Sequence, residues 1–349
     1  MTRSAFWLRT IMAHTRSHSA QSSHSAIGQH QPLCRQSGRS AKAHKPKPHL
    51  NPPTPLAAPL ATAPPPLHIR AMLVPFVKMH GCGNDFVVFD ERAGALGLTP
   101  ARAAALSDRR TGIGCDQFIV LEPAPADSDA AAFMRIRNPD GGEAGACGNA
   151  TRCVVDLLAR EQGRARITVR TVAGDLRSVV EADGRISVDM GPARTEWDAV
   201  PLARAIDTLH VPLARGNFTD PACVSMGNPH ATFFVPDAEA VPIEAIGPGL
   251  ELDPLFPDRA NIGFAQVLGP DRIRLRLWER GAGLTRACGS GACAALVNAH
   301  RRGLTGRRGI VIVDGGELEI AWQDDGRVIM TGPVTTAYTG LIDLDRYAA

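Results

Sequence analysis

Short runs of alternating apolar and polar residues follow one another along most of the chain after residue 71. They are rich in β-branched and aromatic residues and are separated by Gly, Pro and Asp, which is typical of strands joined by turns. The pattern predicts strands at 72–81, 86–90, 117–122, 132–137, 166–172, 176–182, 185–190, 231–235, 264–268, 272–278, 309–314, 317–322 and 327–331.

Two segments break this pattern with apolar residues at helical spacing. In the first, Ala150, Cys153, Val154 and Leu157 recur every three or four residues until Gly163. In the second, the spacing runs from Ala292 to Ala299 and stops at Gly303. Apolar residues at this interval predict helices, and a following glycine is a common helix stop.

The two helical segments belong to an internal repeat. Cys147 and Cys288, just before the helices, are 141 residues apart, and so are the Gly-Pro pairs at 191–192 and 332–333. The stretch AGDLRSVVEADGRISVDMGPA (173–193) resembles GGELEIAWQDDGRVIMTGPV (315–334), and looser matches join 81–86 to 225–230 and 113–117 to 262–266. A single repeat of this length indicates a duplicated domain rather than a solenoid.

Composition separates an N-terminal tail from the repeat. Residues 1–71 contain no Asp or Glu and nine of the 38 Lys and Arg residues, so the rest of the chain is mildly acidic although the formal net charge is +3. The tail is rich in Ser, His, Arg and Pro, and we expect either a functionless tail, for example one translated from a wrongly chosen start codon, or a transit peptide. We therefore predict a disordered or transit-like tail at 1–71, a first half at 72–190 plus 331–349, and a second half at 191–330.

The pattern predicts an α+β fold of two homologous halves, each a curled sheet wrapped around one central helix. No run approaches the roughly 18 apolar residues of a membrane span. The eight cysteines contain no C-x-x-C pair, so we expect no disulfide framework and no metal site. A lone cysteine is most often a small buried residue, which we expect for Cys82, Cys115, Cys153, Cys223 and Cys293.

Cys147 and Cys288 differ from the other cysteines because they open the two helices in the related motifs ACGNATRC (146–153) and ACGSGAC (287–293). The free amides and positive dipole at a helix N-terminus favour an anion, which lowers the pKa of a thiol and can bind a carboxylate. If the halves face each other, one thiolate removes a proton from a carbon and the other thiol returns one to the opposite face. The duplicated motif therefore predicts stereochemical inversion next to a carboxylate.

Six blocks in order resemble the signatures of the diaminopimelate epimerase family: KMHGCGNDF, GCDQ, RNPDGGEAGACGNATRC, SMGNPH, ANIGF and WERGAGLTRACGSGACAA. The resemblance runs from about Lys78 to Gly340. It implies two pseudo-symmetric domains, each a β-barrel around a central helix. It also implies a cofactor-independent enzyme that interconverts LL- and meso-diaminopimelate in lysine and peptidoglycan-precursor synthesis, with Cys147 and Cys288 as the acid and base.

The resemblance also implies a substrate-binding set with two supporting residues. The set is Asn84, Gln117, Asn138, Gly148, Asn149, Asn228, Asn261, Glu279, Arg280, Gly289 and Ser290, and the supporting residues are His230 and Glu279. An arginine fork such as Arg280 suits a distal carboxylate, and amide side chains suit both carboxylate and ammonium because they donate and accept.

Two other classes of function stay open at this point. A related racemase or epimerase acting on proline or hydroxyproline would not need Arg280 and the distal asparagines. A thiol redox switch or a metal-binding module would keep the cysteines without the substrate set. For the epimerase we expect a small-molecule substrate, no cofactor or metal, and neither nucleic acid nor membrane as a partner. A homodimer is compatible with this function. We expect a cytoplasmic location, or the plastid stroma if 1–71 is a transit peptide.

Overall fold

The structure is a computed structural model that describes residues 73–347. The expected tail at 1–71, and Cys34 within it, lie outside the described residues. No helix in the described part of the chain is long and apolar enough to cross a membrane.

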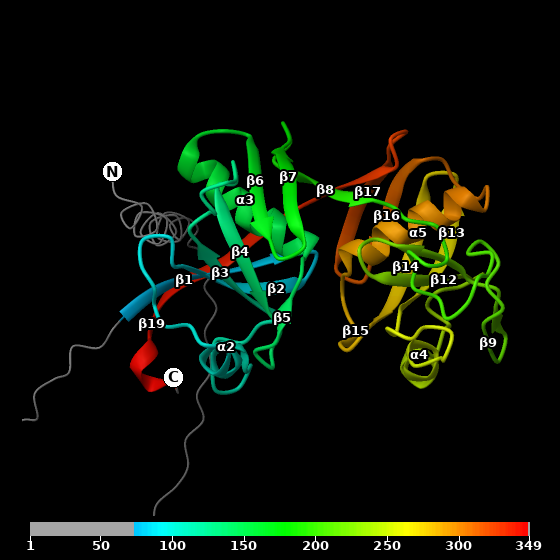
Figure 1. Ribbon diagram of the computed structural model, residues 1–349, viewed down its shortest axis with the longest axis horizontal. Helices are drawn as coiled ribbons and strands as arrows, with labels where there is room; N and C mark the ends of the chain where they lie inside the picture. Colours follow the sequence, from blue (N-terminus) through cyan, green and yellow to red (C-terminus); the bar gives the residue numbers. More distant parts are fainter. Residues whose placement is uncertain (1–72, 348–349) are drawn as a thin grey trace, which may run out of the picture.

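The first half of the molecule is a curled sheet (Figure 1, blue to green). Its strands and helices, in chain order, are β1 (Leu73–Gly81), β2 (Asn84–Asp90), α2 (Pro100–Ser107), β3 (Gln117–Glu122), β4 (Ala132–Arg137), β5 (Glu143–Ala144), α3 (Gly148–Gln162), β6 (Arg166–Thr171), β7 (Gly174–Val180) and β8 (Ile186–Pro192). Neighbouring strands pair antiparallel except at β2–β3 and β4–β6, which are parallel.

The second half repeats this order. Its elements are β9 (Ala214–Arg215), β10 (Phe218–Thr219), β11 (Ala222–Ser225), β12 (Pro229–Phe234), α4 (Ile243–Glu251), β13 (Asn261–Gly269), β14 (Arg272–Glu279), β15 (Gly283–Leu284), α5 (Gly289–Arg301), β16 (Arg308–Val313), β17 (Gly316–Trp322) and β18 (Arg327–Gly332). The parallel pairs β12–β13 and β14–β16 stand at the same places in the series as β2–β3 and β4–β6 in the first half. The duplication inferred from sequence is therefore visible as the same succession of strand pairings.

Two pairings close the structure. β8 pairs antiparallel with β18, with Val188 opposite Met330, and so joins the halves into one hydrogen-bonded network. The last strand, β19 (Thr335–Asp343), crosses back from the second half to pair with β1, and is followed by the short η1 (Leu344–Arg346) (Figure 1).

Each half wraps its sheet around one helix, as the sequence predicts. α3 packs against β1, β2, β6, β7 and β8, and α5 packs against β11 to β14 and β16 to β18. α3 ends where Gly163 takes a left-handed conformation, with φ 66°, which glycine adopts without steric cost. The apolar side of each helix forms the centre of one core cluster, and the five expected structural cysteines are all buried.

One sequence-based expectation was wrong: each half has a second, shorter helix. α2 begins with Thr99 as N-cap and Pro100 in its first turn, and it covers the outer side of the first sheet. α4 covers the corresponding side of the second sheet and contains Pro248, a residue that normally argues against a helix.

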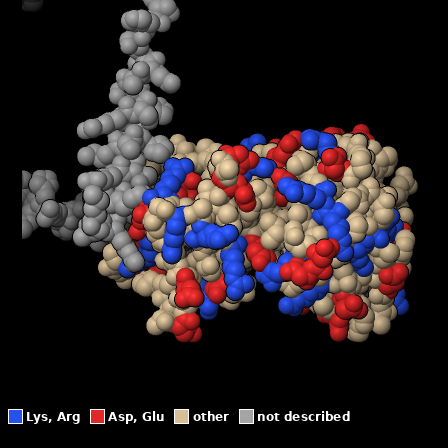
Figure 2. All heavy atoms as spheres, turned by 90° about the horizontal axis from the view of Figure 1, so that it is seen from above, with Lys and Arg blue, Asp and Glu red and all other residues tan. Residues whose placement is uncertain are grey.

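Figure 2 shows acidic and basic side chains interspersed over the upper face of the molecule.

Candidate active site

The two duplicated thiols occupy the same structural position in the two halves. Cys147 is the N-cap of α3, and its Sγ accepts a hydrogen bond from the Ala150 amide at 3.4 Å. Cys288 is the N-cap of α5, and its Sγ lies 3.5 Å from the Ser290 hydroxyl. Each thiol therefore sits where the first amides of a helix point.

The starts of the two helices lie against each other. A Cβ at Gly148 would lie 2.6 Å from the Met330 methyl carbon, and a Cβ at Gly289 would lie 2.9 Å from the Met330 sulfur. Asn149, at the start of α3, donates to the carbonyl of Ala287, at the start of α5, over 3.2 Å. Glycine at both helix starts therefore lets the Met330 side chain pack directly against the backbone of both helices.

Amide side chains of the first half gather beside Cys147. Asn84, at the start of β2, accepts a hydrogen bond from the Asn149 amide at 3.1 Å, and its Oδ1 lies 4.0 Å from the Cys147 sulfur. Gln117, at the start of the parallel strand β3, donates to Asn138 over 3.2 Å. Parallel pairing of β2 and β3 places the starts of both strands at one edge of the sheet.

A second polar group belongs to the other half and leads to Cys288. The His230 Nε2 lies 3.0 Å from both the Asn228 side-chain oxygen Oδ1 and the Ser290 hydroxyl. Because Ser290 is also next to the Cys288 sulfur, a continuous chain of polar contacts joins a buried histidine to this thiol.

Glu279 is the last residue of β14, and Arg280 begins the turn that follows. The Glu279 carboxylate accepts a hydrogen bond from Thr285 at 2.9 Å, and its charge acts on the Cys288 thiol. The backbone amide of Arg280 is held by Asn261, which also donates to the carbonyl of Pro229. The Arg280 guanidinium itself donates to the carbonyl of Asp258 at 2.8 Å and makes no side-chain ion pair within the described residues.

Burial dominates the acid–base properties of the site. It raises the pKa of the Cys147 thiol to about 11, against the opposing effect of the Ala150 amide. Burial, and then the charge of Glu279, raises the pKa of Cys288 well above its usual value. The expectation that the helix start lowers the thiol pKa was therefore wrong, because loss of water outweighs the helix amides.

The same effect acts on the two supporting residues. Burial lowers the pKa of His230 to about 3, and the charge of Arg280 acts in the same direction. Burial raises the pKa of the Glu279 carboxyl, although its hydrogen bond to Thr285 opposes this shift. His230 is thus neutral at ordinary pH.

The sequence did not point to Met190, Met330 or Thr285. The two methionines fill the space against Gly148, and Met330 also meets Gly289. Met190 directly precedes one Gly-Pro pair, whereas Met330 lies two residues before the other, so the 141-residue repeat does not match them to each other and contained no signal for them. In residues 73–347 no cluster of three or more His, Cys, Asp or Glu side chains could hold a metal ion.

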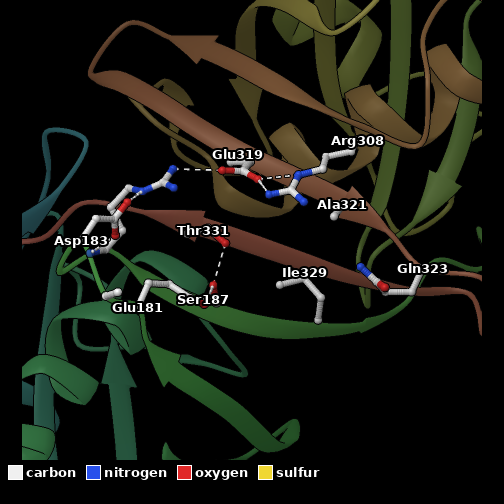
Figure 3. Close-up of a pocket in the computed structure, with 11 residues that line it drawn as sticks. Glu181, Asp183, Ser187, Arg308, Glu319, Ala321, Gln323, Ile329 and Thr331 are labelled. Atoms are coloured by element: carbon white, nitrogen blue, oxygen red, sulfur yellow. Dashed lines mark hydrogen bonds and ion pairs between the residues drawn. The ribbon is translucent and has the colours of Figure 1, made fainter. Parts of the chain in front are cut away.

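A pocket of about 400 Å³ lies away from the thiols, over the β8–β18 junction (Figure 3). Its charged side chains neutralise each other, since Glu319 pairs with both Arg185 and Arg308. Across the strand pair, the Ser187 and Thr331 hydroxyls are 2.7 Å apart. These contacts tie the two halves together, and we assign no chemistry to this pocket.

Comparison with known proteins places the site in context. The family model described as diaminopimelate epimerase matches residues 76–196 and 222–337. A diaminopimelate epimerase of Rhodospirillum centenum is 61% identical over 265 residues, which are 76% of this chain and 91% of that protein. One of Acidiphilium cryptum is 59% identical over 269 residues, 77% of this chain and 96% of that protein.

Solved structures show the same fold at low identity. A predicted epimerase from Pseudomonas aeruginosa aligns with a TM-score of 0.57 and 22% identity over 77% of this chain and 99% of its own. A hydroxyproline epimerase from Agrobacterium vitis aligns with a TM-score of 0.56 and 17% identity over 78% of this chain and 93% of its own.

Proposed function

The chain belongs to the diaminopimelate epimerase family, and from this membership we propose that Cys147 and Cys288 are the base and the acid of the reaction. The chain is an isomerase that converts LL-diaminopimelate to the meso form in lysine biosynthesis. The single observation that carries the two-thiol mechanism is the contact between the two helix starts, each capped by a cysteine.

In the proposed reaction one cysteine acts as a thiolate. It takes the proton from the α-carbon, so the C–H bond breaks, an S–H bond forms, and the electron pair moves into the adjacent carboxylate. The other cysteine then gives its proton to the opposite face, where a new C–H bond forms and a thiolate is left. The amides of Gly148, Asn149, Gly289 and Ser290 are the groups that would stabilise the carboxylate as it gains charge.

His230 supports this chemistry as a neutral group. The Asn228 carbonyl oxygen can only accept, so the neutral ring carries its hydrogen on Nε2. The same N–H reaches Ser290, which leaves the Ser290 hydroxyl free to donate to the Cys288 sulfur. We assign His230 to this relay, Glu279 to the neighbourhood of Cys288, and Asn84, Gln117, Asn138, Asn228, Asn261 and Arg280 to the remaining polar groups of the substrate.

Proton NMR of LL-diaminopimelate in D₂O tests the mechanism. The protein should remove the α-proton signal and produce the meso isomer, whereas Cys147→Ala and Cys288→Ala should lose inversion because one face lacks its proton carrier. Cys153→Ala is a control, since Cys153 lies on α3 with its side chain buried in the apolar core. Inversion that persists in either of the first two variants would rule out the two-thiol scheme, and turnover of proline or hydroxyproline instead would reassign the substrate.

Three further assignments belong to the same proposal. The division into halves at 72–190 plus 331–349 and 191–330 is supported by β19 returning to β1. A homodimer is supported by Leu73 and Leu341, which are 58% and 52% exposed on one face of the β1–β19 pair, and sedimentation of a Leu341→Lys variant tests it. A cytoplasmic location is supported by the bacterial source of the relatives, and cell fractionation would distinguish it from the plastid stroma.

A further inference from the structure

The turn between β14 and β15 carries two residues of the proposed site. β14 ends at Glu279 and β15 begins at Gly283, and the turn is closed by a hydrogen bond from the Ala282 amide to the Glu279 carbonyl at 3.0 Å. Gly281 has φ 73°, which glycine adopts without steric cost. A short loop of this kind needs an outside support to hold two side chains in fixed places.

That support comes from α4, on the outer side of the sheet. Glu251, the last residue of α4, is only 6% exposed. One of its oxygens accepts a hydrogen bond from the Trp278 indole N–H at 2.7 Å, and the other accepts one from the Gly281 backbone amide at 3.0 Å. A single carboxylate therefore holds the residue before Glu279 and the residue after Arg280.

Packing of Trp278 reinforces this attachment. A Cβ at Gly247, one helical turn before Glu251 on the same face of α4, would lie 2.6 Å from the indole ring. A Cβ at Gly283, across the turn, would lie 3.4 Å from the same ring. The indole is therefore held between helix and turn, with its N–H directed to Glu251.

The chemistry of this contact requires a carboxylate. An ionised carboxylate only accepts, which suits the two N–H donors that face it, and Arg259 lies 3.4 Å from the same group. An amide at position 251 would turn an N–H₂ group toward one of these donors. Glu251→Gln therefore removes one of the two hydrogen bonds and changes the volume little.

We propose that Glu251 is a positioning residue of the enzyme, which acts through the 279–282 turn to place Glu279 beside Cys288 and Arg280 in the substrate site. The proposal rests on the proposed function for its effect on turnover. Its effect on Cys288 does not depend on that function. Glu251 itself touches neither thiol nor the proposed substrate groups among its hydrogen-bond partners.

The test compares Glu251→Gln with Glu244→Gln, the same change at an exposed position of the same helix. We expect kcat/KM for LL-diaminopimelate to fall about 10- to 100-fold in Glu251→Gln, the loss typical of a misplaced catalytic group, and to stay at the wild-type value in Glu244→Gln. Trp278→Phe, which removes one donor and keeps the bond to Gly281, should give a smaller loss and provides a second variant if Glu251→Gln does not fold.

Alkylation of the thiols by iodoacetamide, followed by peptide mapping, gives a readout that does not depend on the substrate. Once Glu279 moves away, Cys288 loses a neighbouring negative charge, so its alkylation should shift to lower pH in Glu251→Gln and Trp278→Phe, and should not shift in Glu244→Gln. Unchanged Cys288 alkylation would overturn the proposal, even if activity fell, because the loss would then be general destabilisation. If the wild type did not act on diaminopimelate, the proposed function would be refuted. The alkylation profile of Cys288 would still decide the role of Glu251.

Discussion

A buried neutral histidine makes the stability of this protein depend on pH in a way that can be calculated. His230 is 1% exposed, and its Nδ1 has no hydrogen-bond partner in the described structure. Burial and the nearby charge of Arg280 lower its pKa to about 3, whereas an unfolded histidine titrates near 6.5. The unfolded chain therefore binds a proton in a pH range where the folded protein does not.

The sign and size of the effect follow from this difference. The stability that the neutral ring contributes is fully present above pH 6.5 and is lost progressively as the pH falls toward 3. Between pH 7.5 and pH 5, protonation of the unfolded chain alone costs about 2 kcal/mol of unfolding free energy. This figure needs only a folded pKa well below 5.

Urea unfolding of the wild type and of His230→Gln at pH 7.5 and pH 5 measures the effect. The wild type should lose about 2 kcal/mol more than the variant over this interval, since all other titrating groups are common to both proteins. His210→Gln is the matched control, because His210 is exposed and pairs with Asp220 at the surface. Equal losses in the wild type and His230→Gln would refute the reasoning.

Three further predictions concern the thiols and the helix contact. Asn149→Ala removes the hydrogen bonds to Asn84 and Ala287, so it should lower the free energy of unfolding in urea by about 2 kcal/mol and also reduce kcat. If both values stayed unchanged, the contact between the helices would be dispensable. Because burial raises the pKa of both Cys147 and Cys288, kcat/KM should rise about tenfold per pH unit between pH 6 and pH 8, and a flat profile would contradict the raised values. Cys153→Ala should cost about 1 kcal/mol of stability and leave kcat within about twofold of the wild type, so a large loss of kcat would give this buried thiol a part in the chemistry.

Most of the fold could be predicted from local patterns. The strands of both halves alternate apolar and polar residues because each sheet has an inner and an outer face, and the long helices follow their apolar spacing up to a glycine. α4 could not be predicted, because its sequence IEAIGPGLE contains a proline and two glycines. Its helical form depends on packing against β13, β14 and β15, which lie later in the chain.

The candidate site was predictable as a set of residues but not as a set of contacts. The motifs identified the thiols and the amide side chains, and the structure groups Asn84 with Asn149 and Asn228 with His230. The protonation behaviour could not be predicted, because the pKa values of Cys147 and His230 depend on how completely the surrounding chain excludes water. The position of Cys147 at a helix start, taken alone, predicts a lowered thiol pKa.

Duplication explains why the protein has two thiols, and later divergence explains why they are not equivalent. Asn138 and Glu279 are 141 residues apart, the same interval as Cys147 and Cys288; Asn138 directly follows β4, and Glu279 ends the corresponding strand β14. In the first half this position is a neutral amide bonded to Gln117, and in the second it is a carboxyl whose charge acts on the Cys288 thiol. The Glu279 charge raises the pKa of both thiols, but at Cys288 it is the largest cause after burial, whereas at Cys147 the Ala150 amide opposes burial more than Glu279 adds to it. In the proposed mechanism one thiolate and one thiol are needed at the outset, so this inequality favours the proton on Cys288. Under our proposal for Glu251, its support of the turn in the second half maintains that difference.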